Sequence, residues 1–257
     1  MNIQPFYSGD TYKTKERKGV LKVLTSLRFY LNVIDVTIQA GNIAQRGRYG
    51  DSSFYKSSID AIRALESVGA KFDITGLNNI NKVDGPCVFI ANHMSILETY
   101  VIPCMILPYK KVTFIVKKSL MQYPFLGNTL RAVGAIVVSR ENPRKDLQAV
   151  FTEGVNMLKA GTSLIVFPQS TRTTTFVPAK FNTIGIKLAL KANVPIVPVA
   201  LKTDVCGNGK ILKDFGPLDT KKTVYFAFDT PRVVTGRGTD EHQYVISFIQ
   251  NKLSTWQ

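Results

Sequence analysis

The residues of this chain best suited to chemistry lie between Asn92 and Glu98. An apolar run from Val88 to Ala91 comes directly before them and predicts a buried strand. His93 is one of only two histidines in the chain, and it falls where that strand ends and a helix begins, a common place for chemistry in α/β folds. A histidine followed at short spacing by a carboxylate predicts a general base and the acid that orients it.

The same segment also permits a purely structural interpretation. Positions five apart on one regular helix lie roughly 140° apart around its axis, so His93 and Glu98 meet only if His93 precedes the helix. Ser95 is a good N-cap, and Ser95-Ile96-Leu97-Glu98 is a capping-box pattern. Glu98 would then cap a helix and His93 would only end a strand. This segment by itself leaves both interpretations open.

Composition places the chain among globular proteins. It has 257 residues, of which 45% are hydrophobic and 20% charged, enough for one large α/β domain with or without a helical extension. Its three scattered cysteines, Cys87, Cys104 and Cys206, contain no CxxC pair. They indicate neither a disulfide framework nor a zinc site, and reduced thiols facing the cytoplasm are the default expectation.

The net charge of +15 favours a polyanionic partner. The candidates are an anionic membrane surface, a phosphorylated substrate and nucleic acid. No RNA-binding aromatic motif, zinc finger or basic zipper is present, so nucleic acid is the weakest of these and we expect no such partner. The first twenty residues are polar and basic, which predicts no secretory signal.

Residues 1–70 are expected to form a membrane-associating unit of their own. The polar stretch 1–18 is interpreted as a mobile basic arm. Apolar residues at three- and four-residue steps predict a helix over 19–39, and a polar break at 41–50 separates it from a second helix over 52–68. The first helix carries too many charges for a transmembrane span. It either lies in a membrane interface or packs on the domain as an ordinary amphipathic helix.

Residues 71–257 alternate between strand and helix patterns, which predicts an α/β domain with a mostly parallel central sheet flanked by helices. Strands are expected at 72–75, 88–91, 112–116, 134–138, 162–167, 194–200 and 224–228. Helices are expected at 95–105, 119–131, 143–159, 181–192 and 239–254. Pro124 is expected to interrupt or delay the second of these helices, and two prolines suggest that strand 194–200 is an edge strand or pairs irregularly.

The helix over 143–159 has the clearest boundaries. Asn142 is a good cap, and Pro143 suits the first helical position. Its inward face is expected to consist of Leu147, Val150, Phe151, Val155 and Leu158.

Basic residues follow several of the expected strands, namely Lys117, Lys118, Arg140 and Arg172. The carboxyl ends of parallel strands meet at one edge of a sheet, so these side chains are expected to gather near His93. Any one of them alone is better explained as a solvated surface charge. Their repeated placement predicts a cluster that would suit a phosphate group.

Four segments, taken together, resemble the glycerolipid (lysophospholipid) acyltransferases, the family typified by lysophosphatidic acid acyltransferase. The family's Asn-His, four residues, Asp motif corresponds to Asn92-His93 and Glu98. Its Gly-led strand ending in Arg corresponds to 134–140, its Phe-Pro-Glu-Gly-Thr-Arg-Ser motif to 167–173, and its Val-Pro-Ile-Val-Pro strand to 194–198. Four motifs in the right order are fairly specific, and they cover roughly residues 72–202.

This resemblance implies transfer of an acyl chain from acyl-CoA or acyl carrier protein to the hydroxyl of a lysophospholipid, with lysophosphatidic acid as a candidate acceptor. His93 would be the general base and Glu98 would orient its ring. The implied substrate-binding residues are Asn92, Lys117, Arg140, Gln169, Ser170, Thr171 and Arg172. No metal and no cofactor beyond the thioester co-substrate is implied. We expect the protein on an anionic membrane surface, at its cytoplasmic face.

Two positions depart from the family pattern. Glu98 replaces Asp, so its carboxylate reaches one methylene further. Gln169-Ser170 replaces Glu-Gly, which removes a negative charge and a flexible glycine, although Gln still hydrogen-bonds a hydroxyl. These departures leave an alternative open, a catalytically weak relative that acts as an anionic-lipid-binding protein.

Overall fold

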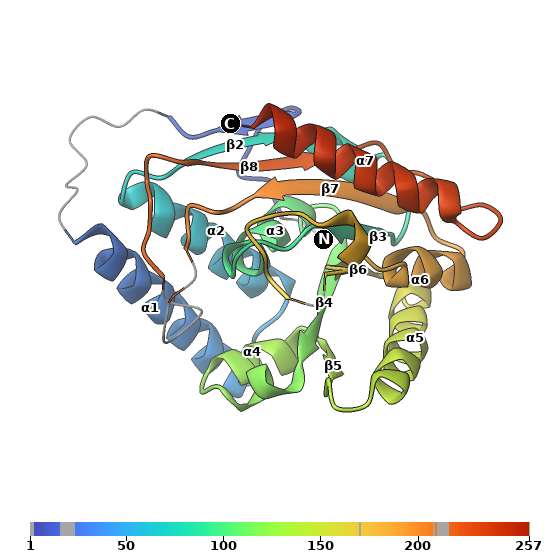
Figure 1. Cartoon of the computed structure of the whole chain (residues 1–257). Coiled ribbons are helices and arrows are strands. Elements are labelled where there is room, and N and C mark those ends of the chain that lie inside the picture. The colour runs from blue at the N-terminus through green and yellow to red at the C-terminus, as the bar shows by residue number, and fades with distance from the viewer. Residues whose placement is uncertain (1–2, 16–23, 170, 208, 210–215, 257) are drawn as a thin grey trace.

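The computed structural model of the protein describes residues 3–15, 24–169, 171–207, 209 and 216–256 (Figure 1). In this part of the chain a single sheet has eight strands in the order β1-β2-β8-β7-β3-β6-β4-β5. The strands are β1 Thr11–Lys13, β2 Lys71–Thr75, β3 Val88–Ala91, β4 Lys111–Lys117, β5 Ile136–Val138, β6 Thr162–Val166, β7 Ile196–Lys202 and β8 Thr223–Phe228. Only β1–β2 and β7–β8 pair antiparallel. The predicted mostly parallel α/β fold is confirmed.

Helices cover both faces of this sheet (Figure 1). The α-helices are α1 Thr25–Gln45, α2 Asp51–Ser67, α3 Leu97–Ile106, α4 Leu126–Ala132, α5 Pro143–Lys159, α6 Ile184–Ala192 and α7 Thr239–Thr255. The 3-10 helices are η1 Leu77–Asn81, η2 Lys118–Gln122 and η3 Pro178–Lys180. Alternate residues of β3 pack into two different hydrophobic cores, one on each face of the sheet. Phe89 packs with the α2 and α3 side, whereas Val88 and Ile90 pack with α5, α6 and α7. Burial on both faces explains the unbroken apolar run of this strand.

The N-terminal arm differs from its prediction. Residues 11–13 form β1, which pairs with β2, and Lys13 makes a 3.0 Å ion pair with Asp73. Tyr12 donates a hydrogen bond to Glu66. Residues 11–13 of the predicted mobile arm therefore form an edge strand of the sheet. A three-residue strand has too little periodicity to be recognised from local sequence. Residues 1–2 and 16–18 of the predicted arm, and the first five positions of the helix predicted over 19–39, lie outside the described residues.

The break predicted at residues 41–50 begins later, because α1 continues to Gln45. Gly41 lies inside this helix, where a Cβ atom would come within 2.4 Å of Phe125. The glycine therefore permits close packing of α1 on the segment that leads into α4, and it does not end the helix. The predicted second helix is confirmed as α2. Among the described helices, none combines the length and the apolar character needed to cross a membrane.

Two further expectations about packing need correction. Strand β7 is central, between β8 and β3, and not an edge strand. Its predicted irregular pairing is present. Val199 pairs with Phe228, but Ile196 pairs with Arg232, so the segment that follows β8 has one extra residue opposite Pro198. On α5, Leu147 is 45% exposed and does not belong to the inward face. The predicted cap by Asn142 is confirmed, since its side chain accepts a hydrogen bond from the Lys145 N–H.

Candidate active site

The junction between β3 and α3 positions His93. Asn92, which is only 1% exposed, extends β3 by side-chain hydrogen bonds to β7. Its Nδ2 donates to the Leu201 carbonyl at 2.8 Å, and the Leu201 N–H donates to its Oδ1 at 2.9 Å. The side chain of Asn92 thus anchors the turn that carries His93. The predicted contact of Asn92 with substrate stays a prediction.

His93 and Glu98 are in direct contact. The distance from His93 Nδ1 to Glu98 Oε1 is 2.8 Å, and the Glu98 side chain is completely buried. The same carboxylate accepts the backbone N–H groups of Met94 and Ser95 at 2.6 and 2.9 Å, while the Thr203 hydroxyl donates to Oε2 at 2.8 Å. Helix α3 begins at Leu97, two residues later than predicted, so His93 precedes it. The N-cap of α3 is Ile96 and not the predicted Ser95, but the Glu98 carboxylate still accepts the Ser95 N–H. The same carboxylate also contacts His93, so the contacts of both interpretations are present, and the role of His93 as a base stays a prediction.

The surroundings of Glu98 determine which nitrogen of His93 carries the proton. Burial alone would raise the pKa of Glu98, but the hydrogen bond and charge of His93, with hydrogen bonds from Ser95 and Thr203, hold this pKa below its usual value. An ionised carboxylate only accepts hydrogen bonds, so Nδ1 of His93 carries the proton. Nε2 is then the proton acceptor, and 19% of the His93 side chain is exposed. This is the geometry of a general base.

The segment after β6 holds His93 from the other side. The ring of Phe167 stacks on the imidazole with 4.3 Å between ring centroids and an interplanar angle of 18°. Gln169 Oε1 accepts the backbone N–H of His93 at 2.7 Å, and Gln169 Nε2 donates to the Thr173 hydroxyl at 2.9 Å. The Thr173 N–H donates to the His93 carbonyl at 3.0 Å. Gln169 both accepts and donates here, whereas an ionised glutamate would only accept.

His93 lies at one end of a cleft of about 820 Å³. Lys117, Arg140, Thr171 and Arg172 line the same cleft, so three of the four basic side chains expected near His93 share its cleft. Lys118 is exposed and does not belong to this lining. Gln169 is only 7% exposed. Ser170 lies outside the described residues, and the predicted substrate contacts of all these side chains stay predictions.

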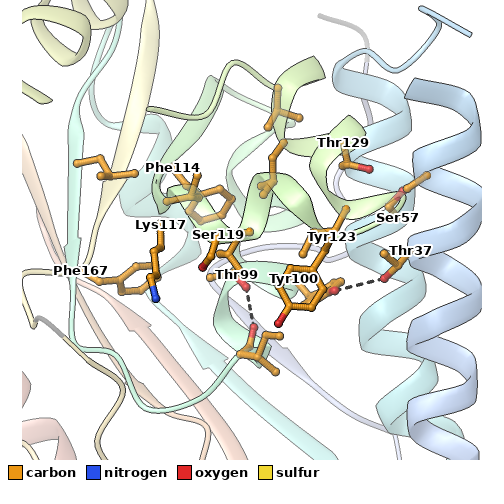
Figure 2. A pocket seen from close by; sticks show the side chains of 18 of the residues that line it. Thr37, Ser57, Thr99, Tyr100, Phe114, Lys117, Ser119, Tyr123, Thr129 and Phe167 are labelled. Atoms are coloured by element: carbon orange, nitrogen blue, oxygen red, sulfur yellow. Dashed lines mark hydrogen bonds between the residues drawn. The ribbon is translucent and has the colours of Figure 1, made fainter. Parts of the chain in front are cut away.

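The rest of the cleft is a long arm between β4 and helices α1 to α4 (Figure 2). Its apolar lining includes Val36, Ala40, Phe54, Ile96, Phe114, Ile115, Val116, Leu120, Leu126, Leu130 and Val133. Several hydroxyls also line it, and Thr37 of α1 lies 3.2 Å from Tyr100 of α3, oxygen to oxygen (Figure 2). One cleft therefore joins a basic, histidine-containing end to a mainly apolar arm.

Sequence reasoning missed several members of this site. Thr203 follows the end of β7, but its side chain is uncharged and nothing in the local pattern distinguished it from an ordinary loop residue. Phe167 belongs to the motif over 167–173, but nothing in the sequence indicated that its ring stacks on His93. The cleft residues of α1 and α2 carried no signal, because an apolar helix residue looks the same whether it lines a cleft or a core.

Comparison with known families shows that the chain is an enzyme of the acyltransferase class. The chain matches the family model described as Acyltransferase over residues 71–202, and it belongs to that family. The match contains all the segments that surround His93, from β3 to β7.

Individual relatives carry a more specific description. The 1-acyl-sn-glycerol-3-phosphate acyltransferase of Pseudomonas aeruginosa is 31% identical over 132 residues, which cover 51% of this chain and 49% of that protein. The chloroplastic 1-acyl-sn-glycerol-3-phosphate acyltransferase BAT2 of Brassica napus is 32% identical over 142 residues, covering 55% and 39%. The aligned part of the chain thus spans about half or less of these relatives.

A solved structure shares the fold over nearly the whole chain. It is the crystal structure of the 1-acyl-sn-glycerophosphate acyltransferase PlsC from Thermotoga maritima. The TM-score is 0.70 at 20% identity, and the match covers 91% of this chain and 95% of that one. The likeness therefore extends beyond residues 71–202 to the helices that line the apolar arm.

Proposed function

We propose that this acyltransferase moves an acyl chain from a thioester, acyl-CoA or acyl carrier protein, to the free hydroxyl of a lysophospholipid, with lysophosphatidic acid as the favoured acceptor. The observation that carries the proposal is the 2.8 Å contact between His93 Nδ1 and buried Glu98 at the basic end of the cleft. The names of the relatives, 1-acyl-sn-glycerol-3-phosphate acyltransferases, support the acceptor.

The chemistry follows from the protonation of this pair. Nε2 of His93 takes the proton of the acceptor hydroxyl as its oxygen attacks the thioester carbonyl. The carbon–sulfur bond then breaks, and the imidazolium returns the proton to the departing thiolate. Glu98 stabilises the imidazolium and keeps the ring in place. General-base catalysis of this kind contributes about 10²–10⁴-fold, and no nucleophile from the protein takes part.

The acceptor phosphate and the acyl chain bind in different parts of the cleft. Arg140 and Arg172 hold the acceptor phosphate, with Lys117 as a weaker contributor, because guanidinium groups match phosphate oxygens in geometry as well as charge. The acyl chain lies in the apolar arm, where each buried methylene contributes roughly 0.8 kcal/mol.

The exposed face of α1 supports a position on a membrane. Leu24, Leu27, Leu31 and Ile34 are 68%, 53%, 57% and 42% exposed, and they repeat at three- and four-residue steps along one helix face. Such a stripe, on a protein with a net charge of +15, suits an anionic interface. We place this interface at the cytoplasmic face. Replacing Leu27 and Leu31 with glutamate should release the protein from anionic liposomes; unchanged co-sedimentation would contradict this placement.

The proposal is tested by acyl transfer to a panel of lysolipids in liposomes. Labelled acyl-CoA and acyl carrier protein are supplied in separate reactions, with His93→Ala alongside. Product that depends on His93 is the expected result, and the lysolipid consumed identifies the acceptor. Lipid binding without transfer from either donor would overturn the proposal and leave a lipid-binding relative in its place.

A further inference from the structure

The junction between β5 and α5 holds Arg140 in an unusual backbone conformation. Its φ angle is +64°, in the left-handed region that side-chain-bearing residues rarely adopt. Only a few residues separate the end of β5 at Val138 from the start of α5 at Pro143. Arg140 nevertheless lines the cleft that contains His93. Something must therefore compensate the cost of this conformation.

Asp146, in the first turns of α5, makes the contacts that hold this turn. Its Oδ1 accepts the Ser139 N–H at 2.8 Å and lies 3.0 Å from the Ser139 hydroxyl. Its Oδ2 accepts the Arg140 N–H at 2.6 Å. Both carboxylate oxygens are thus used by the two residues that precede the helix.

These contacts are not needed to cap α5. The side chain of Asn142 already accepts the Lys145 N–H at 3.1 Å, and Pro143 occupies the first helical position without an N–H to satisfy. The hydrogen bonds of Asp146 instead lead out of the helix toward the strand. They bind the N–H groups of two consecutive peptide units, Val138–Ser139 and Ser139–Arg140.

We infer that Asp146 is a positioning residue for the acceptor: its carboxylate holds the Ser139–Arg140 turn in the conformation that carries Arg140 into the cleft. This inference rests on the proposed function, in which Arg140 binds the acceptor phosphate. Without the carboxylate, the turn relaxes toward ordinary backbone angles. The guanidinium must then be repositioned each time an acceptor binds, which weakens acceptor binding and leaves proton transfer at His93 unchanged.

The test measures kcat and both KM values for the wild type, Asp146→Ala, Arg140→Ala and the double variant. Asp146→Ala should raise the acceptor KM about tenfold with little change in kcat or in the donor KM. The double variant should be no worse than Arg140→Ala, because Asp146 acts only through Arg140. Additive effects, or equal losses for donor and acceptor, would overturn the inference.

Two variants separate positioning from charge and from misfolding. Glu141→Ala removes an equal charge from the same turn without touching the Asp146 contacts, and it should leave the acceptor KM unchanged. Asp146→Asn keeps one accepting oxygen and should fall between the wild type and Asp146→Ala. An acceptor KM that rises equally in Glu141→Ala would assign the effect to charge alone.

Equilibrium binding of lysophosphatidic acid to the same variants separates this inference from the proposed reaction. A wild type that binds this lipid but does not transfer to it would contradict the proposed reaction, and the binding constants would then decide the role of Asp146. Tight binding in the wild type that is unaltered in Asp146→Ala would overturn the inference alone. A wild type that does not bind this lipid would overturn both the inference and lysophosphatidic acid as the acceptor.

Discussion

The β3–α3 and β5–α5 junctions are held by the same kind of hydrogen bonding in different surroundings. In each, a carboxylate from the beginning of a helix reaches back to two backbone N–H groups that precede it. Glu98 binds the N–H groups of Met94 and Ser95, and Asp146 binds those of Ser139 and Arg140. Glu98 is completely buried, whereas Asp146 lies at the edge of the sheet and is accessible to solvent.

This difference in burial separates the roles of the two junctions. A buried carboxylate that loses its charge leaves several buried donors with no adequate acceptor, so the β3–α3 junction must remain intact for the protein to fold and react. At the β5–α5 junction water can replace a lost hydrogen bond. In the proposed function, interactions there adjust how well an acceptor is held, and we expect them to contribute less to the fold.

The largest effect should come from removing the side chain that each junction presents to the cleft, His93 or Arg140. His93→Ala should lower kcat about 10²–10⁴-fold, because the hydroxyl loses its base. Arg140→Ala should chiefly raise the acceptor KM, about tenfold. Steady-state kinetics with the acceptor varied at saturating donor check both. If Arg140→Ala lowered kcat as strongly as His93→Ala, the division of roles between the junctions would be wrong.

One chemical change made at both carboxylates tests the burial argument directly. Glu98→Gln should lower the free energy of unfolding by about 3–5 kcal/mol, since it breaks a buried charged network. Asp146→Asn should change the unfolding midpoint little. Urea unfolding followed by circular dichroism measures both. Equal destabilisation would show that burial does not distinguish the two sites.

A smaller loss of stability is expected at the hydrogen bonds that join the β3–α3 junction to β7. Asn92→Ala leaves the buried N–H and carbonyl of Leu201 without their side-chain partners, which should cost about 2 kcal/mol. Asn92→Asp can accept the Leu201 N–H but cannot donate to its carbonyl, so it should recover only part of the loss. Full recovery in the aspartate variant would indicate that the bond to the carbonyl contributes nothing.

The smallest expected effect is on the pH dependence of stability. The pKa of Glu98 is lower in the folded protein than its usual value of 4.5, so the unfolded chain takes up this proton first as the pH falls. The stabilisation by Glu98 is therefore complete above about pH 4.5 and is lost as the pH falls below it. Thermal unfolding between about pH 3 and pH 6 should give a shallower acid slope in Glu98→Gln than in the wild type. Parallel slopes would contradict the lowered pKa.

Much of the site could be predicted from the sequence because its signals are local. The pairing of His93 with Glu98, the contact of Ser95 with Glu98, and the caps at Asn142 and Pro143 all depend on residues close together in the chain. Hydrogen-bond geometry at a helix start requires these residue types at these spacings. The strand–helix alternation likewise predicted the parallel sheet and the gathering of Lys117, Arg140 and Arg172 at one edge.

Only the tertiary structure decided which distant segments meet. Asn92 and Glu98 find partners more than a hundred residues away, at Leu201 and Thr203, because β7 lies beside β3 in the centre of the sheet. Strand order has no local signature, so the central place of β7 and the addition of β1 could not be predicted. The same holds for Gly41, because its close approach to Phe125 depends on a segment more than eighty residues away. Local spacing specifies hydrogen bonds within a turn, whereas packing between elements is specified by the whole chain at once.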